Sequence, residues 1–261
     1  MKALSTAATG MLAQQLNIEV VSNNIANMNT TGFKRQRAEF QDLLYQNIER
    51  VGANSSDTGT VVPSGIQVGV GVRAAGIYRI TDQGSLQNTG NTFDLAVNGR
   101  GFFQIQLPDG QLAYTRAGSF QIDQTGQMVT SEGYVVQPAI VIPQTATDVS
   151  INEQGDVEFL EAGNTVPANA GRLNLVIFPN EVGLEAIGSN MFLESQASGA
   201  PVLGVAAQNG FGAVLQGFLE QSNVNAVSEI TAMISAQRAY ELNSKVIQTA
   251  DEMLQAANNL R

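Results

Sequence analysis

The chain has 261 residues, of which 43% are hydrophobic and 14% charged, and it contains no cysteine, histidine or tryptophan. This length allows one large or two modest domains with a sizeable core. The missing residue types exclude disulfides, thiolate metal sites and the commonest general base. An enzyme would then have to use carboxylates, lysine, tyrosine or Ser–Lys pairs.

The net charge of −10 is concentrated in one region. Residues 101–220 contain twelve acidic and two basic side chains, whereas the rest of the chain is balanced. This excess argues against nucleic acid or a basic membrane-facing surface, which both need positive charge. We expect this region to form an acidic outer surface. There is no run of 18 apolar residues and no classical signal peptide, so we expect neither direct membrane insertion nor a cleaved leader.

Residues 1–32 are predicted to form a long helix with a heptad repeat. One core position holds Leu4, Met11, Ile18 and Ile25, and the other holds Ala7, Gln14, Val21 and Met28. A spacing of seven residues is typical of a coiled-coil seam. Gly32 stands where a helix C-cap glycine is expected, and an apolar Phe33 follows it.

Residues 33–65 are predicted to be a connecting helix followed by an extended loop. Phe40, Leu44 and Ile48 keep a weak helical period after Lys34. The polar, turn-rich stretch that follows contains several glycines and a proline, which favour a loop.

Residues 66–221 are predicted to form a β-rich body with an acidic outer part. Polar and apolar residues alternate in 66–72 and 103–107. The second run ends in the turn sequence 108–110 and resumes at 112–115, which is typical of a hairpin. Residues 149–159 repeat that pattern, and 173–178 and 213–219 add strands. The expected fold class is α+β, with an antiparallel, Gly-rich middle between terminal helices.

Residues 222–261 are predicted to form a second long helix with two apolar stripes. One stripe holds Ile230, Met233, Tyr240, Ile247 and Leu254, and the other holds Ala239, Leu242, Val246, Met253 and Leu260. A helix with two apolar faces needs more than one partner. Pairing with the N-terminal helix as a coiled coil leaves one stripe for another molecule. The alternative is that both helices pack on the chain's own core.

The sequence gives only weak evidence for two possible enzyme sites. Residues 69–74 match the glycine spacing of a dinucleotide-binding loop but lie inside an alternating strand pattern, without the following helix. Asp156, Glu158 and Glu161 are close in sequence, as glycosidase carboxylates must be in space. Alternating acids on a hairpin more simply form a solvated face.

Motifs are spread along the whole chain, at residues 9–15, 21–27, 29–35, 90–103, 114–120, 219–225 and 237–241. In that order they closely resemble the signatures of bacterial flagellar rod and hook proteins, with Phe93 standing where leucine is usual. The N-terminal motif residues are Asn23, Asn24, Asn27, Asn29, Gly32 and Phe33. Within this axial protein family, the length and residues 45–72 are most similar to the distal-rod branch.

The resemblance implies a structural subunit that forms a helical homopolymer, a rigid hollow drive shaft around an export channel. The implied polymerisation residues are Leu4, Met11, Ile18, Val21, Ile25, Ile230, Met233, Tyr240, Ile247 and Leu254. Such subunits are exported without a cleaved signal peptide and span the periplasm. The implied partners are further copies, proximal rod proteins, the hook protein and the surrounding ring proteins. Together with the weak evidence for enzyme sites, the resemblance leads us to expect no catalytic residue, no cofactor, no metal and no enzyme activity.

The resemblance also implies a mechanical role for residues 46–65. The hook bends and the distal rod does not, and this stretch resembles the distal rod. Its expected stiffening residues are Gln46, Gly52, Ser55, Ser56, Pro63 and Gly65. A proximal rod or hook-type subunit is the alternative function, and an extracellular binding module with a helical stalk is a more distant one.

Overall fold

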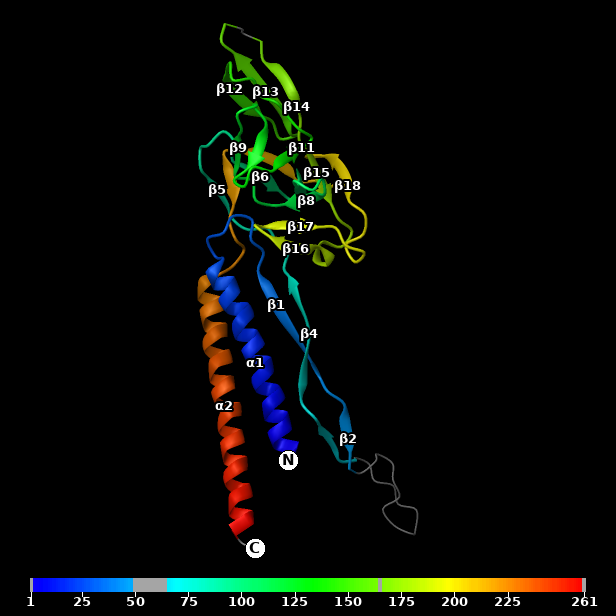
Figure 1. Ribbon diagram of the computed structural model, residues 1–261, viewed down its shortest axis with the longest axis vertical. Coiled ribbons are helices and arrows are strands. Elements are labelled where there is room, and N and C mark those ends of the chain that lie inside the picture. Colours follow the sequence, from blue (N-terminus) through cyan, green and yellow to red (C-terminus); the bar gives the residue numbers. More distant parts are fainter. Residues whose placement is uncertain (1, 49–64, 164–165, 260–261) are drawn as a thin grey trace. The chain divides into compact units, whose positions relative to one another are not determined.

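A computed structural model describes residues 2–48, 65–163 and 166–259 (Figure 1). The chain divides into two compact units. The first comprises Met1–Ile25, Gln36–Tyr78 and Asn225–Arg261, and the second comprises Ala26–Arg35 and Arg79–Val224. The first unit thus continues to Tyr78, whereas the boundary predicted from the sequence lies at residue 66.

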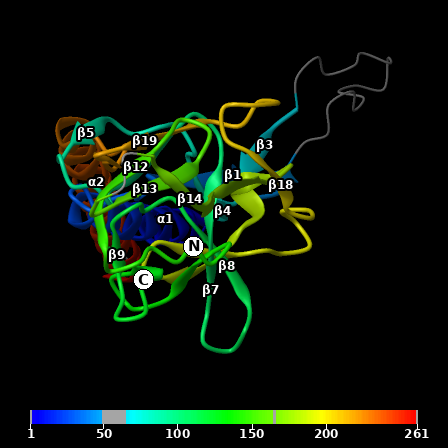
Figure 2. The same cartoon turned by 90° about the horizontal axis from the view of Figure 1, so that it is seen from above.

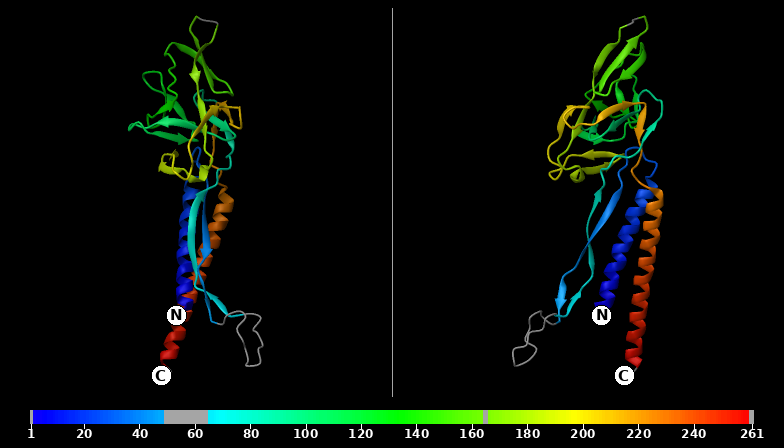
Figure 3. Two further views of the ribbon diagram at one scale, coloured as in Figure 1. Left: turned by 90° about the vertical axis from the view of Figure 1, so that its right-hand side faces the viewer. Right: turned by 180° about the vertical axis from the view of Figure 1, so that it is seen from behind.

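The first unit contains two long helices, α1 (Lys2–Ala26) and α2 (Ala226–Asn259). They pack side by side and run in opposite directions (Figures 1 and 3). The Asn225 side-chain oxygen begins α2 by accepting hydrogen bonds from the backbone N–H groups of Val227 and Ser228, at 3.1 and 3.2 Å. Such N-cap bonds satisfy amides that have no partner inside the helix.

Four strands complete the first unit, with the last residue of β4 counted in the second. They are β1 (Gln36–Asp42), β2 (Tyr45–Asn47), β3 (Gln67–Gly69) and β4 (Val72–Arg79). β1 pairs with β4 and β2 pairs with β3. The predicted helix after residue 33 is therefore wrong. A four-residue apolar spacing fits a helix, but four is also a multiple of two, so it fits one face of a strand equally well.

The second unit is built from short strands, in chain order β5 (Leu86–Asn88), β6 (Leu95–Asn98), β7 (Phe102–Gln106), β8 (Leu112–Thr115), β9 (Phe120–Ile122), β10 (Met128–Thr130), β11 (Val135–Gln137), β12 (Ala146–Ile151), β13 (Asp156–Glu161), β14 (Ala168–Arg172), β15 (Asn174–Ile177), β16 (Glu185–Gly188), β17 (Met191–Leu193), β18 (Val202–Val205), β19 (Ala213–Gln216) and β20 (Phe218–Glu220). A short 3-10 helix covers Glu181–Gly183.

The largest sheet of this unit has the path β16-β17-β8-β7-β11-β10-β9, and β15 joins it to β18. β12, β13 and β14 form a separate antiparallel sheet, and β7 and β8 lie side by side (Figure 2). The hairpins predicted around residues 108–110 and 152–156 are confirmed by the β7–β8 and β12–β13 pairings. The predicted α+β class is confirmed as well.

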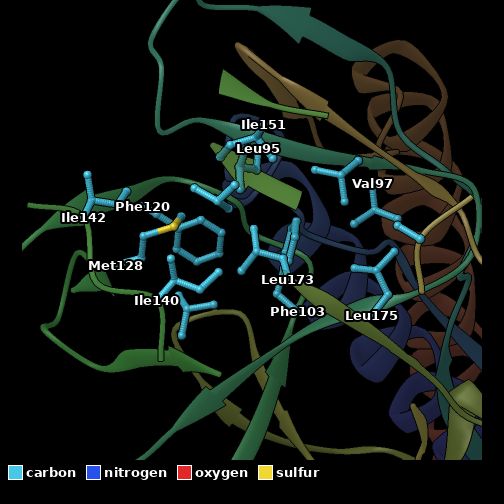
Figure 4. Close-up of a cluster of buried hydrophobic side chains, with 14 residues drawn as sticks. Leu95, Val97, Phe103, Phe120, Met128, Ile140, Ile142, Ile151, Leu173 and Leu175 are labelled. Carbon is cyan, nitrogen blue, oxygen red and sulfur yellow. The ribbon is translucent and has the colours of Figure 1, made fainter. Parts of the chain in front are cut away.

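The core of the second unit lies on both faces of β7, because neighbouring residues of a strand point to opposite sides. Phe103 packs edge-on against Phe120, with ring centroids 5.2 Å apart. Phe102 lies 6.1 Å from both Phe178 and Phe192 on the other side. The cluster around Phe103 is drawn in Figure 4; it holds Leu95, Val97, Phe103, Phe120, Met128, Val136, Ile140, Ile142, Ile151, Val157, Leu173, Leu175, Ala206 and Val214.

Phe103→Ala should lower the free energy of unfolding of the full chain by about 3–5 kcal/mol, because it removes a fully buried ring and leaves a cavity. Urea unfolding followed by circular dichroism measures this change. Val166→Ala is the matched control, since Val166 is 75% exposed. Equal stability of the two variants would contradict the placement of the core.

Candidate assembly surfaces and a buried ion cluster

The buried apolar residues of α1 and α2 have small side chains. Ala7, Ala13 and Val20 of α1 are buried, as are Ala236 and Ala250 of α2. A side chain in place of Gly10 would bring its Cβ within 3.0 Å of the Asn243 amide nitrogen. Small side chains let the two helices approach closely, and this close line of contact fixes which faces remain outside.

Asn24 ties this helix pair to the first strand. Its amide nitrogen donates to the Gln36 carbonyl at 2.8 Å and to the Glu229 carboxylate at 3.0 Å. Its amide oxygen accepts from the Gln36 N–H at 2.8 Å. Asn24 and Glu229 are both fully buried. The side chain of Asn24 therefore serves as a strand partner for one residue of β1 and links that strand to both helices.

The large apolar residues predicted for the α1 seam lie at its edge. Leu4, Met11, Ile18 and Ile25 are half-buried, whereas Val21, from the second heptad position, is 5% exposed. The predicted helix also ends too late, because α1 stops at Ala26 and Met28 lies beyond it. Smaller residues allow the closest approach of the helices and so form the centre.

Much of the remaining helix surface is apolar and exposed. Of the polymerisation residues predicted on α2, Met233 and Ile247 are half-buried. The exposed apolar residues of the two helices are Leu12, Val227, Ile230, Ile234, Tyr240, Leu242, Val246, Met253 and Leu254. Several of them belong to the two predicted stripes. Exposed apolar surface on this scale is typical of an interaction site.

The N-terminal motif residues have different surroundings. Asn23 and Asn29 are exposed, Phe33 is half-buried, and Asn27 accepts a hydrogen bond from the Thr30 hydroxyl at 3.2 Å. Gly32 was predicted to cap α1, but the helix ends six residues earlier, so Gly32 is not its cap. Gly32 has a φ of 69°, and a Cβ there would lie 2.7 Å from the Ala117 nitrogen, so only glycine fits.

A buried ion cluster lies in the second unit, just beyond Gly32. Lys34 Nζ lies 2.7 Å from Glu220 Oε1, and Arg116 Nε lies 2.6 Å from Glu220 Oε2. All three side chains are at least 94% buried. The Gly84 N–H also donates to Oε1, at 2.9 Å. Both carboxylate oxygens thus have charged and hydrogen-bonding partners, as a buried ion requires.

The two cations of this cluster also bind backbone carbonyls. Lys34 donates to the Asp82 carbonyl at 2.8 Å. Arg116 donates to the Val97 carbonyl at 3.1 Å and to those of Gly99 and Gly101. The cluster thereby joins the segments after α1, around β6 and before α2. None of its members was predicted as a site residue, although each lies inside a sequence motif, and an isolated charge in a loop gives no sign of its partner.

The electrostatics of the cluster favour an ionised carboxylate. Burial alone would raise the pKa of Glu220. The attraction and hydrogen bonds of Arg116 and Lys34 outweigh burial and hold the pKa of that carboxyl below its usual range. Burial lowers the pKa of the Lys34 amine, and its attraction to Glu220 offsets part of this effect. Lys34 remains a donor to two acceptors, as an ammonium group would be.

The residues predicted to stiffen the polymer are only partly described. Gln46 pairs with Val68 across β2 and β3, and Gly65 is half-buried. Gly52, Ser55, Ser56 and Pro63 lie outside the described residues.

The described part of the chain gives little support for a metal site, a membrane span or a pair of catalytic carboxylates. Within the described ranges, no three acidic side chains are arranged to hold a metal ion. No described helix has the length and hydropathy needed to cross a membrane. Asp156 forms an ion pair with Arg172 and so takes part in surface pairing.

Glu220→Gln should lower the free energy of unfolding by about 3–5 kcal/mol at neutral pH, because it leaves two buried cations without a counter-charge. The lowered pKa of Glu220 stabilises the fold above the unfolded value of about 4.3, and this contribution is lost as the pH falls through the folded pKa. Urea unfolding at several pH values should show a smaller acid dependence in the variant. The exposed Glu185→Gln should behave as wild type; a similar loss there would contradict the role of Glu220.

Comparisons with known proteins agree with this arrangement. Residues 4–34 match the family described as flagella basal body rod protein, residues 96–159 the flagellar hook protein FlgE/F/G D1 domain, and residues 215–260 the flagellar basal body rod FlgEFG protein C-terminal family. These segments include most of α1, the β7–β8 hairpin and all of α2.

Relatives extend the similarity to the full length. The flagellar basal-body rod protein FlgG of Caulobacter vibrioides is 60% identical over the whole of both chains. The proteins of that name from Agrobacterium fabrum and Borreliella burgdorferi are 50% and 47% identical, covering 97% and 100% of this chain and 97% and 99% of their own. The chain belongs to the family of flagellar basal-body rod proteins, which are structural components of the flagellum and not enzymes.

Proposed function

We propose that this chain is a subunit of the distal rod, which polymerises helically into a rigid hollow shaft that transmits torque. The observation that carries the proposal is the exposed apolar surface of α2, which continues after one side of that helix has packed on α1. Such a surface is satisfied by neighbouring copies. The full-length similarity to proteins named FlgG supports the distal rod over a proximal rod or hook subunit.

The pairing of α1 and α2 within each subunit is proposed to be a coiled coil. The buried positions Glu229, Ala236 and Ala250 recur at multiples of seven, and Asn243 occupies the position between the last two. This repeat supports the proposal. The half-buried Ile18 and Ile25, at the edge of that contact, are available to helices of other copies.

The remaining partners follow from the location in the basal body. We place proximal rod proteins and the hook protein at the two ends of the polymer, and ring proteins around it. The subunit is proposed to span the periplasm. Most of the acidic side chains of residues 101–220 face outward, where water and salt screen their repulsion.

Leu242→Asp should abolish polymerisation and leave the monomer folded. Leu242 is 65% exposed, so a charge there is solvated in the monomer but is buried without a partner once a neighbour covers the face. Electron microscopy of concentrated purified protein should show tubes for the wild type and none for the variant, at equal melting temperature. Gln248→Asp, an exposed change in the same helix, is the control. Tubes formed by Leu242→Asp would contradict the proposal, and a binding module would form none in either case.

Residues 46–65 are proposed to stiffen the polymer by contact with neighbouring subunits. The described residues on both sides of this segment carry large exposed apolar side chains. Leu44, Tyr45, Ile48 and Ile66 are between 50% and 87% exposed. Surface of this kind supports docking, and a docked segment would oppose the sliding between subunits that bending requires.

Deleting residues 49–64 should leave assembly intact and make the rod curved or flexible. The Ile48 N–H donates to the Ile66 carbonyl at 2.8 Å, so the deletion carries an Asn-Gly turn between residues 48 and 65 to keep the paired strand ends. Curvature is measured on electron micrographs of isolated rods. A Gly/Ser segment of equal length is the control, and it should also soften the rod if contacts, not length, are responsible. Straight deletion rods would contradict the stiffening role.

A further inference from the structure

One cation of the second unit has no counter-charge. The guanidinium of Arg79, at the end of β4, lies 5.3 Å from the ring centroid of Phe192. It makes no hydrogen bond or ion pair with any other described residue. Burial lowers the pKa of Arg79, and no nearby carboxylate offsets this effect. Burying a cation partly, without a carboxylate beside it, costs free energy in the isolated subunit. Such a cation favours binding of an anion.

Arg79 lines a small cavity together with Lys34, Thr81, Phe102, Arg116, Glu181, Leu184 and Phe192. The cavity measures about 20 Å³, roughly enough for one water molecule. Thr81, Arg116 and Glu181 also line an open cleft of about 420 Å³ beside it. This geometry suits the tip of a side chain that reaches in across an open surface, and it is too small for a free metabolite.

The other cations near Arg79 already have partners. Lys34 and Arg116 bind Glu220, and Arg100 donates to Glu181 at 2.8 Å. Arg79 is therefore the uncommitted positive charge among the described residues of these two cavities. An incoming carboxylate would gain a charged hydrogen bond there without breaking an existing pair.

Unpaired carboxylates lie on the small β12–β13–β14 sheet. Ser150 is opposite Glu158, and Asp148 is two residues before Ser150, so Asp148 and Glu158 share one face as diagonal neighbours. Both side chains are exposed, and neither carboxylate makes a hydrogen bond or ion pair with another described residue. Two like charges at this separation repel each other, which a cation from another molecule would relieve.

These acids and Arg79 belong to opposite ends of the second unit. Figure 1 shows β12, β13 and β14 at one end of this unit and β17, which carries Phe192, at the other. The two surfaces cannot meet within one copy. Complementary surfaces at opposite ends give a head-to-tail contact, which does not close on itself and which builds an open helical array.

We propose that Arg79 binds the acidic pair Asp148 and Glu158 of a second copy of this chain, with one carboxylate tip entering the small cavity, so that successive β units stack head to tail. This inference rests on the proposed polymerisation and names one contact within it. The contact would be the exception to an otherwise outward-facing acidic surface.

Disulfide trapping tests the contact directly, because the chain has no cysteine of its own. Rods assembled in cells from the variant Thr81→Cys with Glu158→Cys should give, on oxidation, a ladder of cross-linked multimers of this chain. The matched control combines Glu158→Cys with Arg73→Cys, an exposed position near the start of β4, and should give none. Rods that assemble without a ladder, or a cross-link to a different protein, would overturn the inference and leave the proposed function standing.

Charge exchange is the second measurement. Arg79→Met keeps the packing on Phe192 and removes the unpaired charge, so the monomer should melt no lower than wild type, while rods become about tenfold fewer. Arg79→Glu should abolish rods, and adding Asp148→Arg and Glu158→Arg should restore them. A lower melting temperature together with fewer rods would indicate a merely structural Arg79, and failure of the exchanged variant to assemble would refute the pairing.

Discussion

The need to balance one buried carboxylate organises the second unit. Glu220 lies at the end of β20, shortly before the C-terminal helix begins, and it is almost completely withdrawn from water. A buried charge of this kind is tolerated only when opposite charges and hydrogen bonds surround it. Lys34 and Arg116 supply the charges, and the backbone around them is held in place as a result. Gly32, Gly84 and Gly118 occupy positions where a Cβ would strike neighbouring backbone, so the chain is closely packed around the cluster.

The helix pair follows a different rule, in which small residues occupy the centre and large apolar residues the edges. Ala13 and Ala236 allow the backbones to approach, and Asn24 adds a polar clamp to β1. A pair built in this way buries little of its own apolar surface. The free energy available from covering the rest, about 25 cal/mol per Å², remains for contact between copies.

The sequence predicted the elements whose patterns are local. The heptads of α1 and α2 and the alternation around Phe103 needed only neighbouring residues, and the structure contains these helices and that strand. The segment after Lys34 was predicted as a helix because a four-residue spacing is ambiguous. Its extended form depends on pairing with β4, some thirty residues away, which local propensity does not reveal. The ion cluster was missed for a related reason, since its members are separated by 82 to 186 residues.

That separation has a kinetic consequence for a chain whose N-terminus is released first during synthesis or export. Lys34 is 186 residues before Glu220, and Asn24 is 205 residues before Glu229. Neither bond forms until nearly the whole polypeptide is available, because contacts between distant residues close late. α1 therefore cannot complete its packing until α2 is available. Until then α1 lacks its intramolecular partner, and the chain has no completed surface on which a neighbour can dock. Long-range closure would thus keep the subunit from assembling before it has fully emerged.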